Sequence, residues 1–382
     1  MEIIFWLCVI LIIHSFIGYP ISLKIINKIA KKDKISIDSD YCPFVTIVIP
    51  AHNEELVIES KLENITHLNY PSDKLEIIIA SDNSTDSTNE IIKKFCEKSQ
   101  FDNLRLYEVK ERKGKTNAQN EAVKIANGEI IVFSDANSIL KNDSVYQLVK
   151  YFSDDDVAYV SGRLVYINNN ISETSEAENS YWNYDLMMRE YESNISSITA
   201  GNGAIYAIRK KDYINLDPMY CHDSMMPIKS VICNKKAKYN KDAIAYEKAG
   251  ETAEDEFKRK IRMARKNIAI SYSDIQKYNP FKCGWFSYFY FCHRYLRNSL
   301  FILHLLLYIS SLVLFNEGIV YYVAFIGQTI FYILSILGIK NKSKMFYLPY
   351  YYTLTIVAQL KGAINEVSGK SKPFWEKAES TR

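Results

Sequence analysis

The sequence predicts an α/β domain that is attached to a membrane by helices at both ends of the chain. Between residues 44 and 135, four short apolar runs alternate with stretches of helical pattern. This alternation is typical of right-handed βαβ units that form a parallel sheet. Apolar residues make up 48% of the 382 residues, and they gather in long runs at the two ends of the chain. Because about 20 apolar residues suffice for a helix to span a bilayer, both ends are candidate membrane segments.

Charge and cysteine content exclude several functional classes. The formal net charge is only +3, and no basic stripe is interleaved with aromatic residues, so binding to nucleic acid is not expected. The seven cysteines are scattered and form no C-x-x-C pair, which argues against a zinc knuckle or a disulfide scaffold. Dispersed, unpaired cysteines are typical of reduced thiols in a protein that faces the cytosol.

The amino-terminal 35 residues have the pattern of a transmembrane anchor. Residues 3–23 contain no Asp, Glu, Lys or Arg, and Glu2 is the only charged side chain before them. Five lysines follow the apolar run: Lys24, Lys28, Lys31, Lys32 and Lys34. A cleaved signal peptide would carry its positive charge before the apolar run instead. The positive-inside rule therefore predicts an external amino terminus and a cytosolic domain after the anchor.

Four buried strands are expected over residues 44–49, 75–79, 104–109 and 129–132, with helices between them. Acid-bearing loops follow the first, second and fourth of these strands. Since ligands of open α/β sheets bind at the carboxyl ends of the strands, we expect these loops to gather at one edge. No G-x-G-x-x-G pattern follows the first strand, so a dinucleotide fingerprint is absent from this sequence.

An acid and an amide, Asp135 and Asn137, lie two residues apart directly after the fourth predicted strand. Carboxylate and amide oxygens suit Mg²⁺ or Mn²⁺, and substrate phosphates and water commonly complete the coordination of these ions. The alternative is an ordinary polar turn, since Asp and Asn are common turn residues. The pattern alone leaves both interpretations open.

The second half of the domain mixes strands and helices. Strands are expected over 157–166 and 205–208, and helices over 173–192 and 225–235. A further helix is expected from Thr252, because acids are concentrated in its first turn and bases in its later turns, as the helix dipole favours.

The carboxyl-terminal part returns to the membrane pattern. Residues 280–298 combine aromatic and basic side chains, which is typical of a helix lying in the membrane interface. Residues 299–315 and 318–339 are apolar enough for two spans, within a membrane region of 299–365. Residues 346–364 are less apolar, and we expect an interfacial or re-entrant helix there, with a third span as the alternative. A polar tail, 366–382, ends the chain.

Four ordered motifs resemble those of membrane-bound family 2 glycosyltransferases, such as bacterial exopolysaccharide and capsule enzymes. They are Pro50-Ala51-His52-Asn53-Glu54-Glu55, Ser81-Asp82-Asn83-Ser84-Thr85-Asp86, Lys113-Gly114-Lys115-Thr116-Asn117 and Ser134-Asp135-Ala136-Asn137. The resemblance covers residues 44–270. It implies a cytosolic domain with the Rossmann-like, nucleotide-sugar-binding fold called GT-A.

The resemblance implies contacts to a UDP-sugar donor from six residues besides the acid–amide pair: Ala51, Glu54, Glu55, Asp82, Lys115 and Asn117. Asp82 would accept a hydrogen bond from the uracil imide, and Lys115 and Asn117 would lie near the phosphates or the sugar. The alternatives are a turn aspartate, routine acids in a first helical turn, and a solvated helix start.

Asp135 and Asn137 match the family's paired acidic motif, which holds Mg²⁺ or Mn²⁺ on the diphosphate. The second position is Asn here, so metal affinity is expected to be lower because an amide adds no charge. Asp223 falls where the family places its catalytic base, and His222 stands where a second acid often precedes it. The alternative role for Asp223 is a helix N-cap.

Arg259 and Arg262 resemble the family's Gln-or-Arg, x, x, Arg, Trp motif, and the resemblance implies that they hold the departing diphosphate. The alternative is a solvated basic face, or one that meets anionic lipid. Met263 replaces the motif's Trp, which argues against processive synthesis. Gly201-Asn202-Gly203 matches an acceptor-site segment. Trp182 is either a sugar platform or an ordinary core aromatic.

The expected function is that of a metal-dependent, inverting hexosyltransferase in a bacterial-type cell membrane, with its catalytic domain in the cytosol. It would transfer a sugar from a UDP-sugar to a lipid-linked or saccharide acceptor at the membrane during polysaccharide or glycolipid biosynthesis. One alternative is a processive polysaccharide synthase. Another is a non-catalytic nucleotide-binding membrane protein. A membrane oxidoreductase with a nicotinamide cofactor lacks its glycine fingerprint.

Overall fold

The computed structural model describes residues 1–98, 102–167, 173–248, 253–339, 343–371 and 373. The chain divides into two compact units. Unit 1 contains Met1–Ile25, Thr252–Ser273 and Tyr290–Ser371, and unit 2 contains Ile26–Glu251, Asp274–Phe289 and Lys372–Arg382. The part of the predicted polar tail after residue 373 lies outside the described residues.

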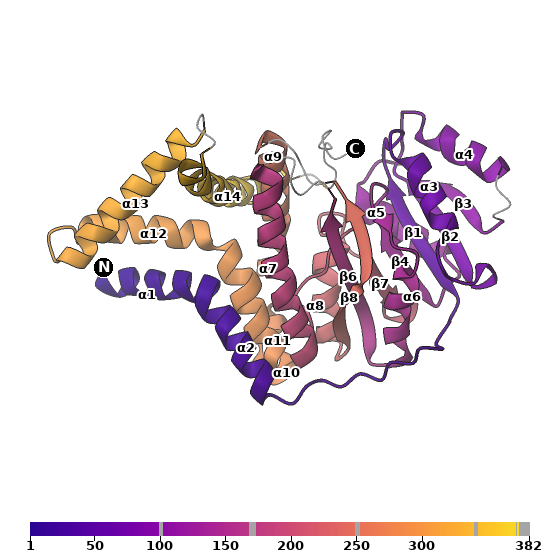
Figure 1. The fold of residues 1–382 in the computed structure, drawn as a ribbon, viewed down its shortest axis with the longest axis horizontal. Coiled ribbons are helices and arrows are strands. Elements are labelled where there is room, and N and C mark those ends of the chain that lie inside the picture. Colours follow the sequence, from indigo (N-terminus) through magenta and orange to yellow (C-terminus); the bar gives the residue numbers. More distant parts are fainter. Residues whose placement is uncertain (99–101, 168–172, 249–252, 340–342, 372, 374–382) are drawn as a thin grey trace. The chain divides into compact units, whose positions relative to one another are not determined.

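Unit 2 is built on an eight-stranded sheet with the strand order β3-β2-β1-β4-β7-β6-β8-β5 (Figure 1). The strands are β1 (Val45–Ala51), β2 (Leu75–Ser81), β3 (Leu104–Glu108), β4 (Ile130–Ser134), β5 (Ile139–Leu140), β6 (Val157–Tyr166), β7 (Ile205–Arg209) and β8 (Lys236–Glu247). The α/β class and the first four predicted strands are therefore confirmed.

The sheet is mixed, so the prediction of a parallel sheet holds only for part of it. Strands β1, β2, β3 and β4 are mutually parallel, and β1 lies between β2 and β4, with Ile47 opposite both Ile77 and Val132. Strand β7 runs antiparallel to both β4 and β6. A strand reached through a long connection is free to enter the sheet from either end, and the alternating pattern of the first half contains no information about it.

The apolar runs in the sequence correspond to strands that are buried along their whole length. Every residue of β1, β2 and β4 is buried, as expected for strands covered on both faces. The helices of unit 2 are α3 (Ile58–Thr66), α4 (Thr88–Lys98), α5 (Lys115–Ile125), α6 (Ser144–Val149), α7 (Glu173–Ile195), α8 (His222–Ile232), α10 (Pro280–Cys283) and α11 (Trp285–Phe289). Helix α8 begins three residues before its predicted start.

Unit 1 is helical. It contains α1 (Glu2–Ile13), most of α2 (Tyr19–Ile29), α9 (Ala253–Tyr272), α12 (Leu300–Val313), α13 (Ile319–Leu337) and α14 (Lys344–Val367). A π-helical turn, His14–Gly18, joins α1 to α2, and a second, Tyr290–Leu296, precedes α12. Helix α9 packs along α14 and groups with this unit, although we predicted it as the end of the cytosolic domain.

Two helical segments of the described chain are long and apolar enough to cross a membrane, Glu2–Ile29 and Ile319–Leu337. A third span results if Trp285–Leu296 and Leu300–Val313, which meet at a bend of 63°, are counted as one broken span. The predicted interfacial helix over 280–298 is interrupted, because Gly284 adopts a φ of +55° between α10 and α11. That conformation is accessible chiefly to glycine.

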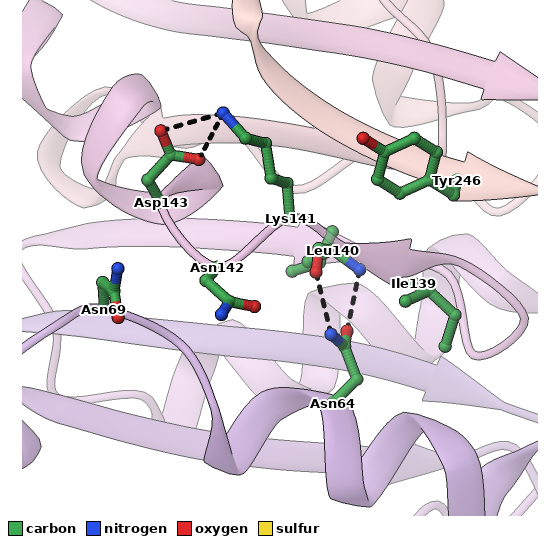
Figure 2. Close-up of a pocket in the computed structure, with 8 residues that line it drawn as sticks. All are labelled: Asn64, Asn69, Ile139, Leu140, Lys141, Asn142, Asp143 and Tyr246. Atoms are coloured by element: carbon green, nitrogen blue, oxygen red, sulfur yellow. Dashed lines mark hydrogen bonds and ion pairs between the residues drawn. The ribbon is translucent and has the colours of Figure 1, made fainter.

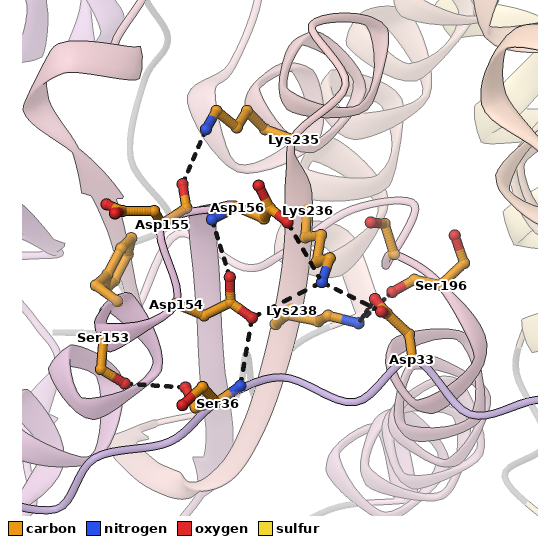
Figure 3. Close-up of polar contacts among 12 residues, drawn as sticks. Asp33, Ser36, Ser153, Asp154, Asp155, Asp156, Ser196, Lys235, Lys236 and Lys238 are labelled. Atoms are coloured by element: carbon orange, nitrogen blue, oxygen red, sulfur yellow. Dashed lines mark hydrogen bonds and ion pairs between the residues drawn. The ribbon is translucent and has the colours of Figure 1, made fainter.

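The chain after the first span runs along unit 2 as an extended tether, residues 33–40 (Figure 3). Asp33 forms ion pairs with Lys238 (2.7 Å) and Lys236 (3.2 Å) on β8. Farther along, the backbone N–H of Ser36 donates to Asp154 Oδ2 (3.3 Å). These contacts fix the tether beside the start of β8, at the opposite end of that strand from Glu247.

Candidate active site

The loops after β1 and β2 interlock at the carboxyl edge of the sheet, as the sequence predicted. Asn53 adopts a left-handed conformation (φ +55°), and its Oδ1 accepts a hydrogen bond from the backbone N–H of Thr85 (2.7 Å). The Glu55 carboxylate accepts from the backbone N–H of Ser87 (3.0 Å), so this acid joins the two loops. Glu54 is buried beside them, at 7% exposure. Its contact with a donor and that of Ala51 stay predictions.

Asp82 is buried at the end of β2 and organises the loop before α5. Its Oδ1 and Oδ2 accept hydrogen bonds from the backbone N–H groups of Lys113 (3.1 Å) and Gly114 (2.8 Å). Its own N–H donates to the carbonyl of Ala51 (2.8 Å). Asp82 therefore connects three loops. It is buried, so it is not an ordinary solvent-exposed turn aspartate. Each oxygen has a second lone pair, so the predicted contact to a base remains open.

Lys115 and Asp135 form an ion pair at the carboxyl end of β4. A Cβ added at Gly203 would lie 2.8 Å from Lys115 Nζ and 3.1 Å from Asp135 Oδ2, so only glycine leaves this space open. Burial alone would lower the pKa of Lys115, but Asp135, with Asp223 and Glu247 farther away, outweighs burial and raises that pKa. The charge of Lys115 is therefore stabilised mainly by Asp135, with smaller contributions from Asp223 and Glu247.

The donor set at this place fits a divalent cation. Asp135 already faces a cationic group, and the absent side chain of Gly203 leaves room beside the carboxylate. Among the described residues, no group of three or more His, Cys, Asp or Glu side chains is placed to hold a metal by itself. Asp135 and the half-buried Asn137 would therefore hold Mg²⁺ or Mn²⁺ together with substrate phosphates, which is the usual arrangement for these ions.

Asp223 lies in the first turn of α8 and is partly exposed. The N-cap of α8 is Cys221 and has no side-chain cap hydrogen bond, so the capping role considered for Asp223 is wrong. The backbone carbonyl of Asp223 accepts from the N–H of Gly201 (2.7 Å), which ties α8 to the predicted acceptor segment. His222 is 1% exposed and packs edge-on against Phe133, so it is a core residue.

Hydrogen bonds to β6 and from α7 hold the predicted acceptor segment, Gly201–Gly203, in place. The Asn202 amide donates to the carbonyl of Gly162 (2.6 Å), and its oxygen accepts from the backbone N–H of Ala204 (3.1 Å). The Arg189 guanidinium donates to the carbonyl of Gly201 (2.7 Å) and lies over the ring of Trp182, 5.0 Å from its centroid. The Trp182 indole N–H donates to a backbone carbonyl in β6, which fits the core-aromatic interpretation.

Arg259 and Arg262 lie on α9 in unit 1, whereas the groups above belong to unit 2. Arg259 forms two hydrogen bonds with the buried Glu256 carboxylate, at 2.8 and 3.0 Å. The pair resembles a fork on a carboxylate, the same geometry with which arginine binds phosphate. The role of both arginines in holding a diphosphate stays a prediction.

Two residues of the site region were missed by sequence reasoning. Lys61, on α3, is fully buried and donates hydrogen bonds to Ser134 Oγ (2.7 Å) and to the carbonyl of Ser138 (2.6 Å). Glu247, the last residue of β8, accepts a hydrogen bond from the Ser138 hydroxyl. A lysine within an amphipathic helix and an acid at the end of an unrecognised strand gave no signal in the sequence.

A shallow pocket of about 560 Å³ lies elsewhere, between α3 and β5 (Figure 2). Asn64 spans it, because its amide donates to the carbonyl of Leu140 (2.8 Å) and its oxygen accepts from the N–H of Leu140 (2.7 Å). Lys141 and Asp143 pair beside it. None of the predicted site residues lines this pocket, and its polar groups pin the short strand β5 in place.

Comparison with solved structures identifies the fold. Over 96% of this chain and 99% of the other, the structure superposes on the mannosyltransferase PcManGT of Pyrobaculum calidifontis, solved in complex with GDP-Man and Mn²⁺, with a TM-score of 0.72 and 21% identity. This likeness shows that the chain has the Rossmann-like α/β architecture called GT-A, flanked by helices apolar enough to span a membrane.

The sequence comparison then assigns a family to one domain of the chain. Residues 46–215 match the family model described as Glycosyl transferase family 2. The chain is 39% identical over 128 residues to the probable glycosyltransferase YdaM of Bacillus subtilis (strain 168), which is 33% of this chain and 30% of that one. The chain therefore contains a family 2 glycosyltransferase domain, and the resemblance noted in the sequence is confirmed.

A second relative comes from Methanococcus voltae and is described as a dolichyl N-acetyl-alpha-D-glucosaminyl phosphate 3-beta-D-2,3-diacetamido-2,3-dideoxy-beta-D-glucuronosyltransferase. It is 37% identical over 141 residues, which is 35% of this chain and 42% of the relative. The chain thus spans less than half the length of either curated relative.

Proposed function

We propose that this protein is an inverting glycosyltransferase that transfers a sugar from a UDP-sugar to an acceptor at the membrane, with the help of Mg²⁺ or Mn²⁺. The observation that supports the proposal best is that Asp135 and Lys115 pair beside the open space at Gly203, while the Asp223 backbone is hydrogen-bonded to Gly201 in the same segment. These groups provide a cation site, a phosphate-binding ammonium and a base at one edge of the sheet.

The chemistry follows from the roles of the side chains. Asp223 takes the proton of the acceptor hydroxyl as its oxygen attacks the anomeric carbon, and the bond from that carbon to the diphosphate oxygen breaks with inversion. Lys115 offsets negative charge on the leaving diphosphate, and Arg259 and Arg262 would add to this effect. The metal, when bound at Asp135 and Asn137, supplies further charge neutralisation there.

The proposed donor is a nucleoside diphosphate sugar, and we propose uracil as its base. Asp82 is the group that we assign to the uracil imide, and its buried position between three loops supports a fixed geometry. The structural neighbour PcManGT was solved with GDP-Man. A guanine nucleotide is therefore the alternative that any donor screen has to include.

The acceptor that we propose is lipid-linked or a growing saccharide at the inner membrane face. The apolar helices of unit 1 support membrane association, and the name of the Methanococcus voltae relative describes a lipid-linked acceptor. Met263, in place of a Trp that would stack under an acceptor sugar, favours single transfers over processive synthesis. Long products at low turnover would favour the processive alternative instead.

A donor screen tests the proposal. The full chain in membranes is incubated with individual UDP- and GDP-sugars, Mn²⁺ or Mg²⁺, and membrane extract as acceptor, and release of nucleoside diphosphate is measured. We expect metal-dependent turnover of at least one UDP-sugar, loss of turnover in Asp135→Ala and retained turnover in Asn137→Asp. Absence of turnover with every donor and metal would refute the enzyme proposal.

A second variant separates catalysis from binding. In Asp223→Asn the base is lost while the amide keeps the shape of the side chain, so transfer should fall about 10²- to 10⁴-fold. Binding of UDP with Mn²⁺ should be retained, as measured by calorimetry. If the protein were a non-catalytic nucleotide-binding scaffold, Asp223→Asn would leave the cellular glycan unchanged.

A further inference from the structure

Lys61 is a charged residue in a place where charge is costly. It lies on α3, its side chain has no exposed surface, and the apolar residues Ile58, Leu62 and Ile65 of the same helix belong to the main core. Burial lowers its pKa to about 7, although Asp135 and Glu247 oppose this effect. A methionine would fill similar space without a polar group, so the ammonium needs an explanation beyond packing.

The two hydrogen bonds of Lys61 enclose the predicted metal-binding segment. Its Nζ donates to Ser134 Oγ at the end of β4 and to the carbonyl of Ser138, at 2.7 and 2.6 Å. Asp135 and Asn137 lie between these two partners in the sequence. The N–H of Ser138 donates to the carbonyl of Asp135 (3.2 Å), which closes the segment into a turn. One amine therefore holds both ends of a five-residue turn.

The same network reaches the acceptor side of the site. The Ser134 hydroxyl donates to the carbonyl of Ala204 (2.9 Å), the residue after the glycine that faces Lys115 and Asp135. On the other side, the Ser138 hydroxyl donates to the Glu247 carboxylate at the end of β8. Lys61 thus joins β4, the Gly201–Ala204 segment and β8 through two serines.

We propose that Lys61 is a positioning residue, which holds the Ser134–Ser138 turn so that Asp135 and Asn137 point at one metal–diphosphate position. This inference rests on the proposed function. The amine touches neither substrate nor metal and acts only through the turn. Groups that orient metal ligands commonly change metal affinity by 10- to 100-fold when they are removed, because ligand sites tolerate little displacement.

Lys238 provides a matched control for this role. It is also buried, at 1% exposure, and its Nζ donates to the carbonyls of Ser193 (2.8 Å) and Ser196 (2.5 Å). It lies near the start of β8, whereas Glu247 is at the end of that strand. Lys238→Met also removes a buried ammonium, together with its hydrogen bonds to two carbonyl acceptors and its ion pair to Asp33, but it leaves the Ser134–Ser138 turn untouched.

The test measures nucleotide binding as a function of metal. Calorimetry of the full chain in detergent gives the Mn²⁺ concentration for half-maximal binding of UDP, or of GDP where UDP does not bind. We expect this concentration to rise at least 10-fold in Lys61→Met and to stay within 2-fold of wild type in Lys238→Met. Where donor turnover is measurable, the metal requirement of Lys61→Met should shift in parallel, and saturating Mn²⁺ should restore part of the rate.

The outcomes separate this inference from the proposed function. Absence of metal-dependent nucleotide binding in the wild type would overturn both. Metal-dependent binding that is the same in wild type and Lys61→Met, or reduced equally in Lys61→Met and Lys238→Met, would overturn only the positioning role. If Lys61→Met does not fold, Ser134→Ala decides the question, because it removes one acceptor of Lys61; an unchanged Mn²⁺ requirement in that variant would also overturn the proposal.

Discussion

At the scale of single residues, the acids of this domain differ in what they already bind. Both Asp82 oxygens accept backbone N–H groups at the start of α5, and Glu55 accepts one from the next loop. Asp135 instead pairs with a lysine side chain, which can change its conformation. A lysine can move away when a metal or a phosphate arrives, whereas backbone donors cannot. Asp135 is therefore the acid best suited to exchange partners.

The same comparison shows why the sequence predicted some roles and not others. Asp135 and Asp82 follow apolar strands, and the sheet rule places such residues at one edge. Lys61 and Glu247 have no such marker, because their importance depends on contacts across 77 and 109 residues of sequence with the Ser138 carbonyl and hydroxyl. Long-range hydrogen bonds of this kind have no periodic pattern.

The buried Lys61 predicts a pH dependence of stability. Its pKa is about 7 in the folded chain and 10.5 in the unfolded reference, so between these pH values the unfolded state binds more protons and stability rises with pH. Below pH 7 both states are protonated, and the destabilisation is fully present. The free energy of unfolding should therefore gain on the order of 2 kcal/mol from this group between pH 7 and 9.

The measurement compares wild type with Lys61→Met by guanidinium unfolding in detergent at pH 6.5 and pH 9. Other groups that titrate in this range, such as Lys277 with its pKa lowered by burial to about 8, are present in both proteins and cancel. The free energy of unfolding of Lys61→Met minus that of wild type should be more positive at pH 6.5 than at pH 9. A difference that does not change with pH would show that Lys61 titrates normally.

At the scale of secondary-structure elements, β8 is the long strand that the sequence analysis did not predict. This 12-residue strand contains three lysines, and one of them, Lys238, is buried in the sheet. Strands are recognised in a sequence by alternating apolar residues, and the lysines of β8 interrupt this alternation. The first four strands were predictable because β1, β2 and β4 are buried throughout and contain few charged residues.

The tether of residues 33–40 accounts for the buried charge on β8 and yields the next prediction. Asp33 pairs with Lys238 and Lys236 (Figure 3). Asp33→Ala leaves the Lys238 ammonium buried with carbonyl acceptors only, so we expect a loss of about 1–3 kcal/mol in the free energy of unfolding, seen as a lower thermal midpoint.

Asp155→Ala is the control for the tether. The Asp155 carboxylate is 85% exposed and forms only long ion pairs, at 3.8 Å with Arg209 and 3.6 Å with Lys211. Exposed pairs of this kind contribute little, so its thermal midpoint should stay near that of wild type. Equal shifts in both variants would mean that the tether contributes no more than an ordinary surface pair.

At the scale of the whole molecule, the open question is how many times the chain crosses the membrane. The lysines after the first span predict an external amino terminus and a cytosolic unit 2. If Trp285–Leu296 and Leu300–Val313 form one broken span, the chain leaves the cytosol there and returns through α13. The turn between α12 and α13, which contains Asn316, would then be external.

Thiol labelling of intact cells tests this topology. A cysteine introduced as Asn316→Cys, in a Cys233→Ser background, should react with a membrane-impermeant maleimide without permeabilisation. The native Cys233 is exposed on unit 2, so in the otherwise unchanged chain it should react only after permeabilisation. The two sites therefore report opposite sides of the membrane in the same assay. If α12 did not span, Asn316→Cys would be protected in intact cells, and α13 alone would carry the chain outward. Labelling of Cys233 in intact cells would instead place the catalytic domain outside, where no cytosolic pool of nucleotide sugar could reach it.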